Sequence, residues 1–388
     1  MSVTAAKGFV ANGVHCGIRK SGRRDLAVVR SLVPATGAGM FTANRVQAAP
    51  VVVSREHLAA ADTQAVVINS GVANAATGEQ GVIAARTTAA EAAWLFGLAP
   101  EQVAVLSTGV IGAPLPLDKV LGGVRSAALQ LTRAGGGAAA EAIMTTDTRA
   151  KESLSRGSGF VVGGMAKGSG MIHPNLATML AVVTTDYPLV SGEAIDFLRP
   201  AVNASFNSIS VDGECSTNDS VLLLANGASG VARTPASDEQ FALCLRKVCA
   251  DLARQIVADG EGATVLAEIA VRGAASEPEA RAIAERVATS PLVKTALHGR
   301  DANWGRIASA AGSARWQDGY ARLDPDLLSI VIDGVPVLAS GSPTGGEPEL
   351  ANGHCSIELD LALGSGEATY LTTDLSHEYV SINADYRS

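Results

Sequence analysis

Short runs of β-branched and other apolar residues alternate along the chain with longer amphipathic stretches. Such runs predict β-strands where glycine-rich turns bound them. In the first half of the chain they lie at residues 25–33, 64–70, 102–107 and 159–164. In the second half they lie at residues 263–273, 327–334, 355–363 and 368–374. We therefore expect strands throughout the chain, with the C-terminal part especially rich in them.

Helical periodicity fills several of the stretches between these strands. It predicts helices over residues 79–98, 117–131, 238–258 and 276–289. The third helix has the clearest pattern, and we expect Ser237 and Gln240 to form a capping box at its start and Gly260 to follow its end. The glycine-rich patch 133–142 is interpreted as a surface loop that enters a helix.

Helices and strands intermix without a regular βαβ rhythm. Stacked layers of helix and sheet are therefore favoured over a doubly wound parallel sheet, and the fold class expected is mixed α+β. The sequence shows no clear linker and no repeat of 20–50 residues that would divide the chain.

Composition limits the class of protein further. Apolar residues make up 47% of the 388 positions and charged residues 18%, as in a globular protein. The net charge of −8 argues against nucleic acid as a partner, because phosphate binding needs a basic surface. Apolar runs are too short for a signal peptide or a bilayer span. The five scattered cysteines suit a reducing compartment, so we expect a soluble, cytoplasmic protein.

Most familiar catalytic patterns are missing from the sequence. It contains no Walker A motif, no Gly-x-Ser-x-Gly, and no Gly-x-Gly-x-x-Gly between a predicted strand and a predicted helix. The six histidines show no metal-ligand spacing, so no metal is expected. Residues 133–138 match a loose coenzyme A-binding pattern of acetyltransferases, but no strand precedes them and a chance match is the preferred interpretation.

The segment 167–180, KGSGMIHPNLATML, is the main candidate for chemistry. Its glycines and Pro174 restrict the backbone in unusual ways, and Ala177 offers little bulk to shield its carbonyl from the Thr178 hydroxyl. One interpretation is an ordinary turn that leads into a core strand. The other is a peptide bond that cleaves itself. The pattern alone favours the ordinary turn, because no short motif defines such a bond.

Cleavage before Thr178 would produce an unusual catalytic group. Attack of the hydroxyl on the Ala177 carbonyl converts the peptide into an ester, which water can hydrolyse. Thr178 would then carry a nucleophilic hydroxyl and an α-amino group whose reference pKa of ~7.7–8.0 suits a general base. One residue would supply both functions without a histidine.

Residues 167–180 closely resemble the autocleavage segment of the ornithine acetyltransferases (glutamate N-acetyltransferases) of arginine biosynthesis. Other stretches resemble blocks of the same family in the same order, so the resemblance covers nearly the whole chain. They lie at 41–51, 69–78, 107–112, 142–152, 212–227, 259–264, 290–299, 303–307 and 372–388.

The resemblance implies a precursor that splits into an α chain, 1–177, and a β chain, 178–388, which stay folded together. It implies an α/β/β/α layered fold similar to N-terminal nucleophile hydrolases, and a heterotetramer or larger assembly. The implied reaction moves an acetyl group from N-acetylornithine to the threonine and then to glutamate, without a cofactor. Some members of the family also accept acetyl-CoA as donor. A self-cleaving aminopeptidase or amidase and an uncleaved binding protein remain the alternatives.

The resemblance also implies roles for individual residues. Thr178 is the expected nucleophile, and Thr108 and Gly109 match an oxyanion hole, where glycine lets the backbone approach closely. The expected substrate contacts, besides Thr178 itself, are Thr145, Lys167, Glu261, Asn383 and Ser388. The cation among them suits a substrate carboxylate. The last two predict that the C-terminal tail folds back over a pocket.

Three positions depart from the family pattern. Val265 stands where a lysine is common, Ala302 where a proline is common, and Ser388 where threonine is more frequent. The segment between Thr145 and Thr178 is a few residues short. These departures bear on substrate contacts and donor preference, not on the nucleophile.

Overall fold

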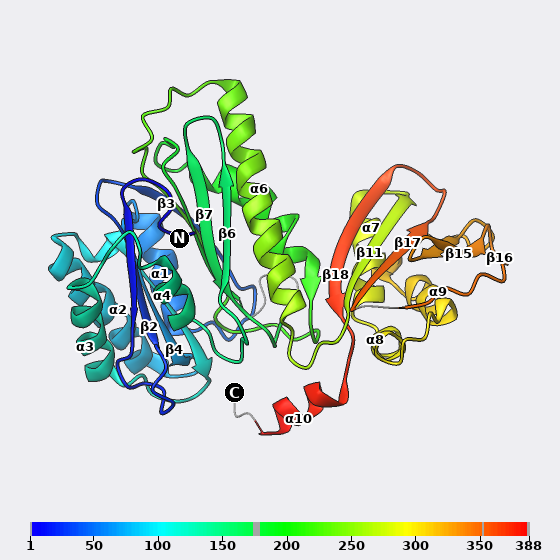
Figure 1. The fold of residues 1–388 in the computed structure, drawn as a ribbon, viewed down its shortest axis with the longest axis horizontal. Coiled ribbons are helices and arrows are strands. Elements are labelled where there is room, and N and C mark those ends of the chain that lie inside the picture. Colours follow the sequence, from blue (N-terminus) through cyan, green and yellow to red (C-terminus); the bar gives the residue numbers. More distant parts are fainter. Residues whose placement is uncertain (1, 174–178, 351–352, 386–388) are drawn as a thin grey trace. The chain divides into compact units, whose positions relative to one another are not determined.

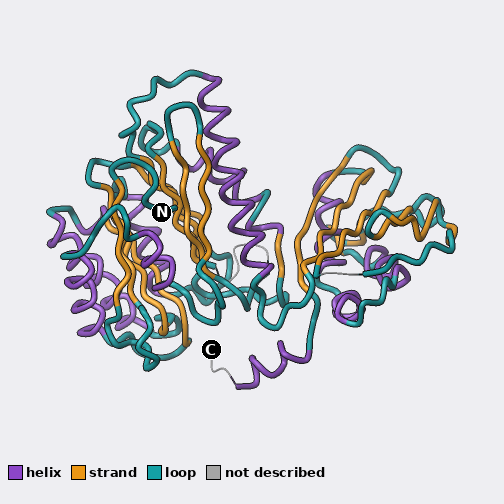
Figure 2. The backbone as a smooth tube through the Cα atoms, viewed as in Figure 1, coloured by secondary structure: helices purple, strands orange, loops and turns teal. Residues whose placement is uncertain are grey.

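The structure is a computed structural model that describes residues 2–173, 179–350 and 353–385. Its chain forms two compact units. Unit 1 comprises residues 1–207 and 214–256, with the last two residues of the chain, and unit 2 comprises residues 208–213 and 257–386. Helices and strands occur in both units (Figure 2), so the predicted α+β class is confirmed.

Two mixed sheets form the centre of unit 1. The first has the order β1-β2-β4-β5, with bounds Phe9–Val14, Leu26–Ser31, Ala65–Val72 and Val103–Val110. The second has the order β3-β10-β8-β7-β6, with bounds Thr36–Phe41, Ser220–Ala225, Leu180–Thr185, Val161–Lys167 and Lys151–Arg156. Only the pairs β4–β5 and β10–β8 are parallel within the described part of these sheets.

Most helices of unit 1 cover the outer faces of the two sheets, whereas α4 belongs to the core that the sheets share. Their bounds are α1 Ala49–Ala60, α2 Gly78–Phe96, α3 Leu117–Ala128, α4 Gly136–Ala142, α5 Ala194–Asn203 and α6 Pro235–Ala258. Figure 1 shows α2 and α3 beside the first sheet and α6 beside β6 and β7 of the second.

Successive side chains of a strand point to opposite faces of its sheet, and this alternation explains the layering. In β2, Val29 joins a core that the two sheets share, while Val28 joins the core beneath α2 and α3. On the second sheet, Leu252 of α6 lies directly against Gly164 of β7. Unit 1 therefore has the predicted α/β/β/α order of layers.

Unit 2 is built on one mixed sheet of the order β16-β15-β14-β17-β11-β18-β9. The bounds of these strands, in that order, are Ser342–Pro343, Val335–Ala339, Ser329–Ile332, His354–Asp360, Leu266–Ala274, Gly366–Thr373 and Ile209–Ser210. Its helices are α7 Glu277–Ala288, α8 Pro291–His298, α9 Trp304–Gly312 and α10 His377–Asp385. A short hairpin pairs β12 Arg315–Trp316 with β13 Gly319–Tyr320. Alternate residues of β11 pack against the apolar side of α7 in its core.

Two local predictions need correction. Helix α6 begins at Pro235, and the reciprocal bonds of its capping box link Thr234 and Ser237 at 2.8 and 3.1 Å. Gln240 instead accepts a hydrogen bond from the Ser158 N–H. The patch 133–142 enters a helix as predicted, but the loop is shorter than expected, because α4 already begins at Gly136 and is largely buried.

The composition of α4 has a packing reason. A Cβ on Gly13 of β1 would lie only 1.9 Å from the carbonyl oxygen of Ala138. The helix backbone therefore contacts the strand backbone directly, and only glycine on the strand and small residues on the helix allow this. The low complexity of the patch reflects this close contact.

In the sequence, the predicted cleavage bond stands between β7 and β8, and its two residues lie outside the described part of the chain. Strands β7 and β8 pair antiparallel, with Lys167 opposite Leu180. The predicted α and β chains thus contribute neighbouring strands to one sheet, and their boundary differs from that between the units. Among the described residues, no helix is both long and apolar enough to cross a membrane.

Candidate active site

Two of the predicted site residues meet in unit 1. Thr108 lies near the end of β5 and Lys167 is the last residue of β7. The Lys167 Nζ donates a hydrogen bond of 3.3 Å to the Thr108 Oγ1, and both residues are buried. The predicted oxyanion-hole hydroxyl and the predicted substrate-binding cation therefore stand together, although 59 positions separate them in the sequence.

Gly109 has a backbone conformation that favours glycine. Its φ of 132° lies in the region that residues with a side chain rarely adopt. A Cβ at this position would lie 2.2 Å from the carbonyl carbon of Gly71 on the neighbouring strand β4. The backbones of the two glycines are in close contact, so no other residue fits at position 109 without moving β4.

Asp147 connects the remaining predicted residue of unit 1 to this pair, and the sequence analysis did not identify it. Its Oδ2 accepts a 2.9 Å hydrogen bond from the Thr145 N–H, and its Oδ1 accepts one of 2.7 Å from the Gly168 N–H. The Nζ of Lys151 lies 2.6 Å from the same Oδ1, and both side chains of this ion pair are fully buried. One carboxylate thus anchors the loop that carries Thr145 and the residue that follows Lys167.

The charges of this cluster compensate one another. Burial raises the pKa of the Asp147 carboxyl, but the charges of Lys167 and Lys151 and the Gly168 N–H outweigh it and bring the pKa down to about 2. Asp147 is therefore ionised at neutral pH. The cluster holds cationic charge next to Thr108, where an oxygen that becomes negative would be stabilised.

Arg19 is a second residue that the sequence analysis missed. Its guanidinium donates to the carbonyl oxygens of Met144 and Thr145 at 2.8 and 3.0 Å. These carbonyls belong to the loop that follows α4, and the guanidinium fixes that loop by satisfying two of its acceptors. No local signal links position 19 to position 145, so only the tertiary structure could identify this contact.

Two further predicted residues meet in unit 2. The Asn383 Nδ2 on α10 donates a 2.8 Å hydrogen bond to the Glu261 Oε2. The Ser376 Oγ donates one of 2.6 Å to the carbonyl oxygen of Gly262. The tail therefore folds back over the loop that carries Glu261. Ala177, Thr178 and Ser388 lie outside the described residues, and the roles of all these residues stay predictions.

One of the three departures, Val265, has a structural explanation. Val265 is buried, and its backbone N–H donates to the Asp374 Oδ1 at 2.9 Å. Its side chain belongs to the apolar core of unit 2 and so supplies packing instead of a charge. Ala302 lines a small, shallow pocket in the same unit, next to Asp301 and Asn303, and nothing in the described part of the chain explains the replacement of proline there.

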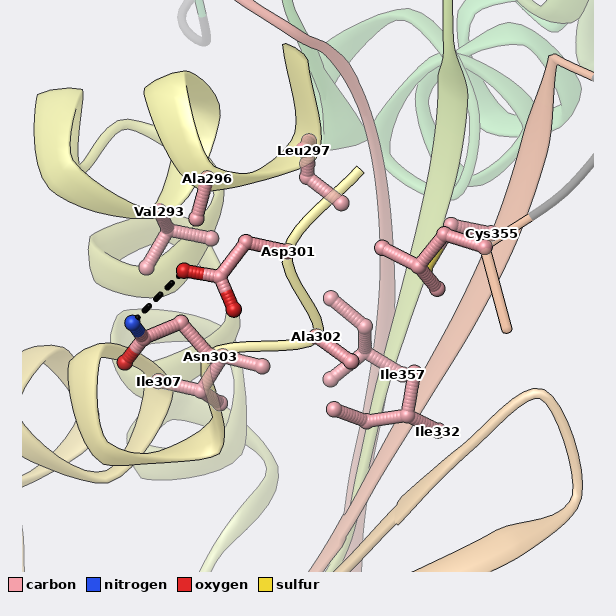
Figure 3. Close-up of a pocket in the computed structure, with 11 residues that line it drawn as sticks. Val293, Ala296, Leu297, Asp301, Ala302, Asn303, Ile307, Ile332, Cys355 and Ile357 are labelled. Carbon is pink, nitrogen blue, oxygen red and sulfur yellow. Dashed lines mark hydrogen bonds between the residues drawn. The ribbon is translucent and has the colours of Figure 1, made fainter. Parts of the chain in front are cut away.

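This pocket has little that supports catalysis. Its other lining residues are aliphatic apart from Cys355, and Figure 3 shows the 2.9 Å hydrogen bond between Asn303 and Asp301 at one side. The Asn303 side chain also caps α9 by accepting the Arg306 N–H. Burial raises the pKa of the Cys355 thiol to about 12, so it does not supply a thiolate at neutral pH. The buried cluster of unit 1 is therefore the stronger candidate.

Comparison with known proteins establishes the class. The model of the ArgJ family matches residues 10–388. The chain therefore belongs to the ArgJ family, and the enzyme class expected from the sequence, an acyltransferase of arginine biosynthesis, is confirmed.

Individual relatives are similar over the full length. The chain is 48% identical over 396 residues to the arginine biosynthesis bifunctional protein ArgJ of Syntrophotalea carbinolica, and the match covers 98% of each chain. It is 47% identical over 393 residues to the protein of the same name from Streptomyces coelicolor, with both chains covered completely. An ornithine acetyltransferase of Mycobacterium tuberculosis, solved in complex with ornithine, is 40% identical and covers 45% of this chain and 96% of its own, with a TM-score of 0.41.

Proposed function

We propose that this chain cleaves itself before Thr178 and then transfers an acetyl group from N-acetylornithine to glutamate by a ping-pong mechanism. The observation that carries the proposal is the buried Lys167–Thr108 pair, which lies at the end of the strand that leads into the cleavage segment. Membership of the ArgJ family, and relatives whose name includes arginine biosynthesis, support this choice of reaction.

In the self-cleavage step, the Thr178 oxygen bonds to the Ala177 carbonyl carbon and the bond from that carbon to the Thr178 nitrogen breaks. The hydroxyl proton ends on the nitrogen, and water then hydrolyses the ester. Because β7 and β8 share a backbone ladder, the two products stay paired after the bond is cut. We expect at least one copy of each chain in the active assembly, and a heterotetramer or larger.

In the transfer step, the new α-amino group takes the proton from the Thr178 hydroxyl, which attacks the acetyl carbon of N-acetylornithine. Thr108 and the Gly109 N–H stabilise the negative oxygen, with the Lys167 charge beside them. Ornithine leaves, and the amine of glutamate attacks the acetyl-threonine to form N-acetylglutamate. Acetyl-CoA as a second donor would give the chain two activities, as for the relatives that are named bifunctional. The enzyme needs no cofactor, and its five free cysteines suit the cytoplasm.

The decisive experiment compares Thr178→Ala with Thr178→Ser. Intact-mass spectrometry should find two fragments for the natural chain and for Thr178→Ser, and a single full-length chain for Thr178→Ala. Only the cleaved proteins should form ornithine from N-acetylornithine and glutamate. A full-length natural chain that still turns over substrate would refute the proposal.

A second measurement separates transfer from hydrolysis. The cleaved enzyme receives N-acetylornithine with and without glutamate, and the release of ornithine and acetate is followed. Transfer predicts that sustained ornithine release needs glutamate. Rapid acetate release without glutamate would instead identify a hydrolase.

A further inference from the structure

Two adjacent residues, Asn218 and Asp219, have no role in the mechanism above, although each holds a strand of the candidate site. They precede β10, which lies beside β8 in the second sheet. Both are buried, at 4% and 0% exposure. Their contacts reach the strand of the oxyanion-hole residues on one side and the strand of the nucleophile on the other.

Asn218 holds the strand of the oxyanion-hole residues. Its Nδ2 donates hydrogen bonds of 2.7 Å to the carbonyl oxygen of Ala73 and 2.8 Å to that of Ser107. Ser107 immediately precedes Thr108. Both hydrogens of the amide are therefore used to fix β5 and the end of β4.

Asp219 holds the strand that follows the cleavage site. Its Oδ1 accepts a 2.9 Å hydrogen bond from the Met179 N–H, and the Ser220 N–H donates one of 3.1 Å to the Met179 carbonyl. The regular ladder between β8 and β10 begins only at Leu180. The Asp219 side chain thus extends the pairing by one residue toward Thr178, whose carbonyl carbon is bonded directly to the Met179 nitrogen.

The Asp219 carboxyl is fully buried, and the Thr42 and Ser216 hydroxyls lie close to it beside the Met179 N–H. The Asp219 Oδ2 itself is buried and has no hydrogen-bond partner in the described part of the chain. Burial raises the pKa of this carboxyl well above its usual range, although the Met179 N–H and the charge of Lys167 act against it. A buried polar atom without a partner costs free energy and calls for an explanation.

We propose that Asn218 and Asp219 form a positioning element that sets the nucleophile of the cleavage reaction opposite the oxyanion-hole strand. Asp219 is the decisive member, because it fixes the peptide unit shared by Thr178 and Met179. This inference rests on the proposed function and adds positioning residues to it. In this role Asp219 acts as a hydrogen-bond acceptor, so a neutral amide should replace it.

The test measures the rate of self-cleavage in pulse-labelled chains made by cell-free translation. Asp219→Ala should slow cleavage by about 100-fold, because a small displacement of the reacting groups has an effect of that order. Asp219→Asn keeps an acceptor for the Met179 N–H and should cleave close to the natural rate. In the fraction of Asp219→Ala that does cleave, kcat should fall while KM for N-acetylornithine is unchanged.

The opposite end of β8 offers a matched control. Asp186 is also buried, and its two oxygens accept the N–H groups of Val161 and Lys7 at 2.7 and 3.0 Å. Asp186→Ala removes the same kind of contact and should leave the cleavage rate near that of the natural chain. If Asp219→Ala does not fold, Asp219→Leu fills the volume without accepting a hydrogen bond, and the same slowing is expected.

Three results would overturn the inference. They are natural cleavage rates in both Asp219→Ala and Asp219→Leu, equal slowing in Asp186→Ala, or slowing in Asp219→Asn as severe as in Asp219→Ala. The last would mean that the proton of the carboxyl matters more than its acceptor. Failure of the proposed function gives a different result, because the natural chain itself would then stay full length and still turn over substrate.

Discussion

Lys167 of unit 1 and Lys294 of unit 2 are both almost completely buried, yet their surroundings differ. Lys167 lies near the ionised carboxylate of Asp147, whose pKa its charge lowers. Lys294 donates to neutral groups, namely the hydroxyls of Thr372 and Thr373, each at 3.1 Å, and the carbonyl oxygen of the second. The charge of Lys167 is compensated by a nearby carboxylate. The charge of Lys294 is stabilised mainly by hydrogen bonds to neutral groups.

The difference appears in the protonation of the two clusters. Burial lowers the pKa of Lys294 to about 8, against the opposing charges of Asp374 and Asp212. Asp374 itself is occupied by hydrogen bonds from the Thr264 N–H and side chain, the Val265 N–H and His298. Unit 1 thus keeps an ion pair across the neutral pH range, whereas unit 2 holds a lysine that approaches deprotonation. A permanent charge beside Thr108 suits a site that must stabilise a negative oxygen.

The largest change in stability should come from removing the Asp147 carboxylate, which compensates the buried lysine charges of unit 1. Asp147→Asn removes the carboxylate from the buried ion pair with Lys151, which should lower the free energy of unfolding by about 3–5 kcal/mol. Urea denaturation measures this. The control is Glu56→Gln, which breaks the exposed ion pair with Arg86 and should change stability by about 1 kcal/mol or less. An equal loss in both variants would contradict the comparison.

The next effect concerns the lysine of unit 2. Below pH 8 the folded protein carries the full penalty of the buried Lys294 charge, because its pKa of about 8 lies below the unfolded value. As pH rises from about 8 to ~10.4, the unfolded chain binds this proton more strongly than the folded one, so stability should rise by about 3 kcal/mol. The measurement is urea denaturation across this range for the natural chain and Lys294→Met. The variant should lack this rise, and identical slopes would refute the assignment.

Acid should weaken the unit 1 cluster in a separate window. The pKa of Asp147 is about 2 in the folded chain, below the unfolded value. Its contribution, about 2 kcal/mol, is complete above ~pH 4 and is lost as the pH falls toward 2. The difference in stability between the natural chain and Asp147→Asn, followed from pH 5 downward, should therefore shrink. A constant difference would mean that the neighbouring charges do not lower the pKa of the Asp147 carboxyl in the folded chain.

The smallest effect is expected at Asn383. Its hydrogen bond to Glu261 lies at the surface of unit 2 and joins a carboxylate to a neutral amide. Asn383→Ala should change the free energy of unfolding by about 1 kcal/mol or less, while KM for the substrates rises if the predicted contacts hold. Thermal unfolding and steady-state kinetics test the two parts. A large loss of stability with an unchanged KM would show that the residue only holds the tail.

The sequence predicted elements well where one side of the element is regularly apolar. The helix predicted at 238–258 is observed at Pro235–Ala258, because its apolar positions recur at helical spacing. Strands β3 and β6 were missed for the opposite reason. In β6, Lys151, Ser153 and Ser155 are the buried positions, so the alternation of burial is present but the buried side is polar. The start and the burial of helix α4 were misjudged because its glycines and alanines are selected for backbone contact.

The candidate site was predictable in part, because some of its residues lie in continuous stretches of sequence that resemble the family. Thr108, Lys167 and Glu261 were identified because they lie in blocks that resemble the family, and the structure gives each of them a polar partner. Arg19 and Asp219 act through contacts with residues far away in the chain, and no spacing rule reveals such contacts. Asp147 lies within one of the blocks, but its importance follows only from the two lysines around it.

The sequence by itself determined the periodic elements, the family and the residues that the family's motifs mark, because these depend on side chains close together in the chain. Only the tertiary structure decided which polar groups share a low-dielectric interior. Lys167 reaches Thr108 across 59 positions, and Asp219 reaches Met179 across 40. The charge state of a buried group depends on its burial and its neighbours, and both are fixed only when distant strands pack together.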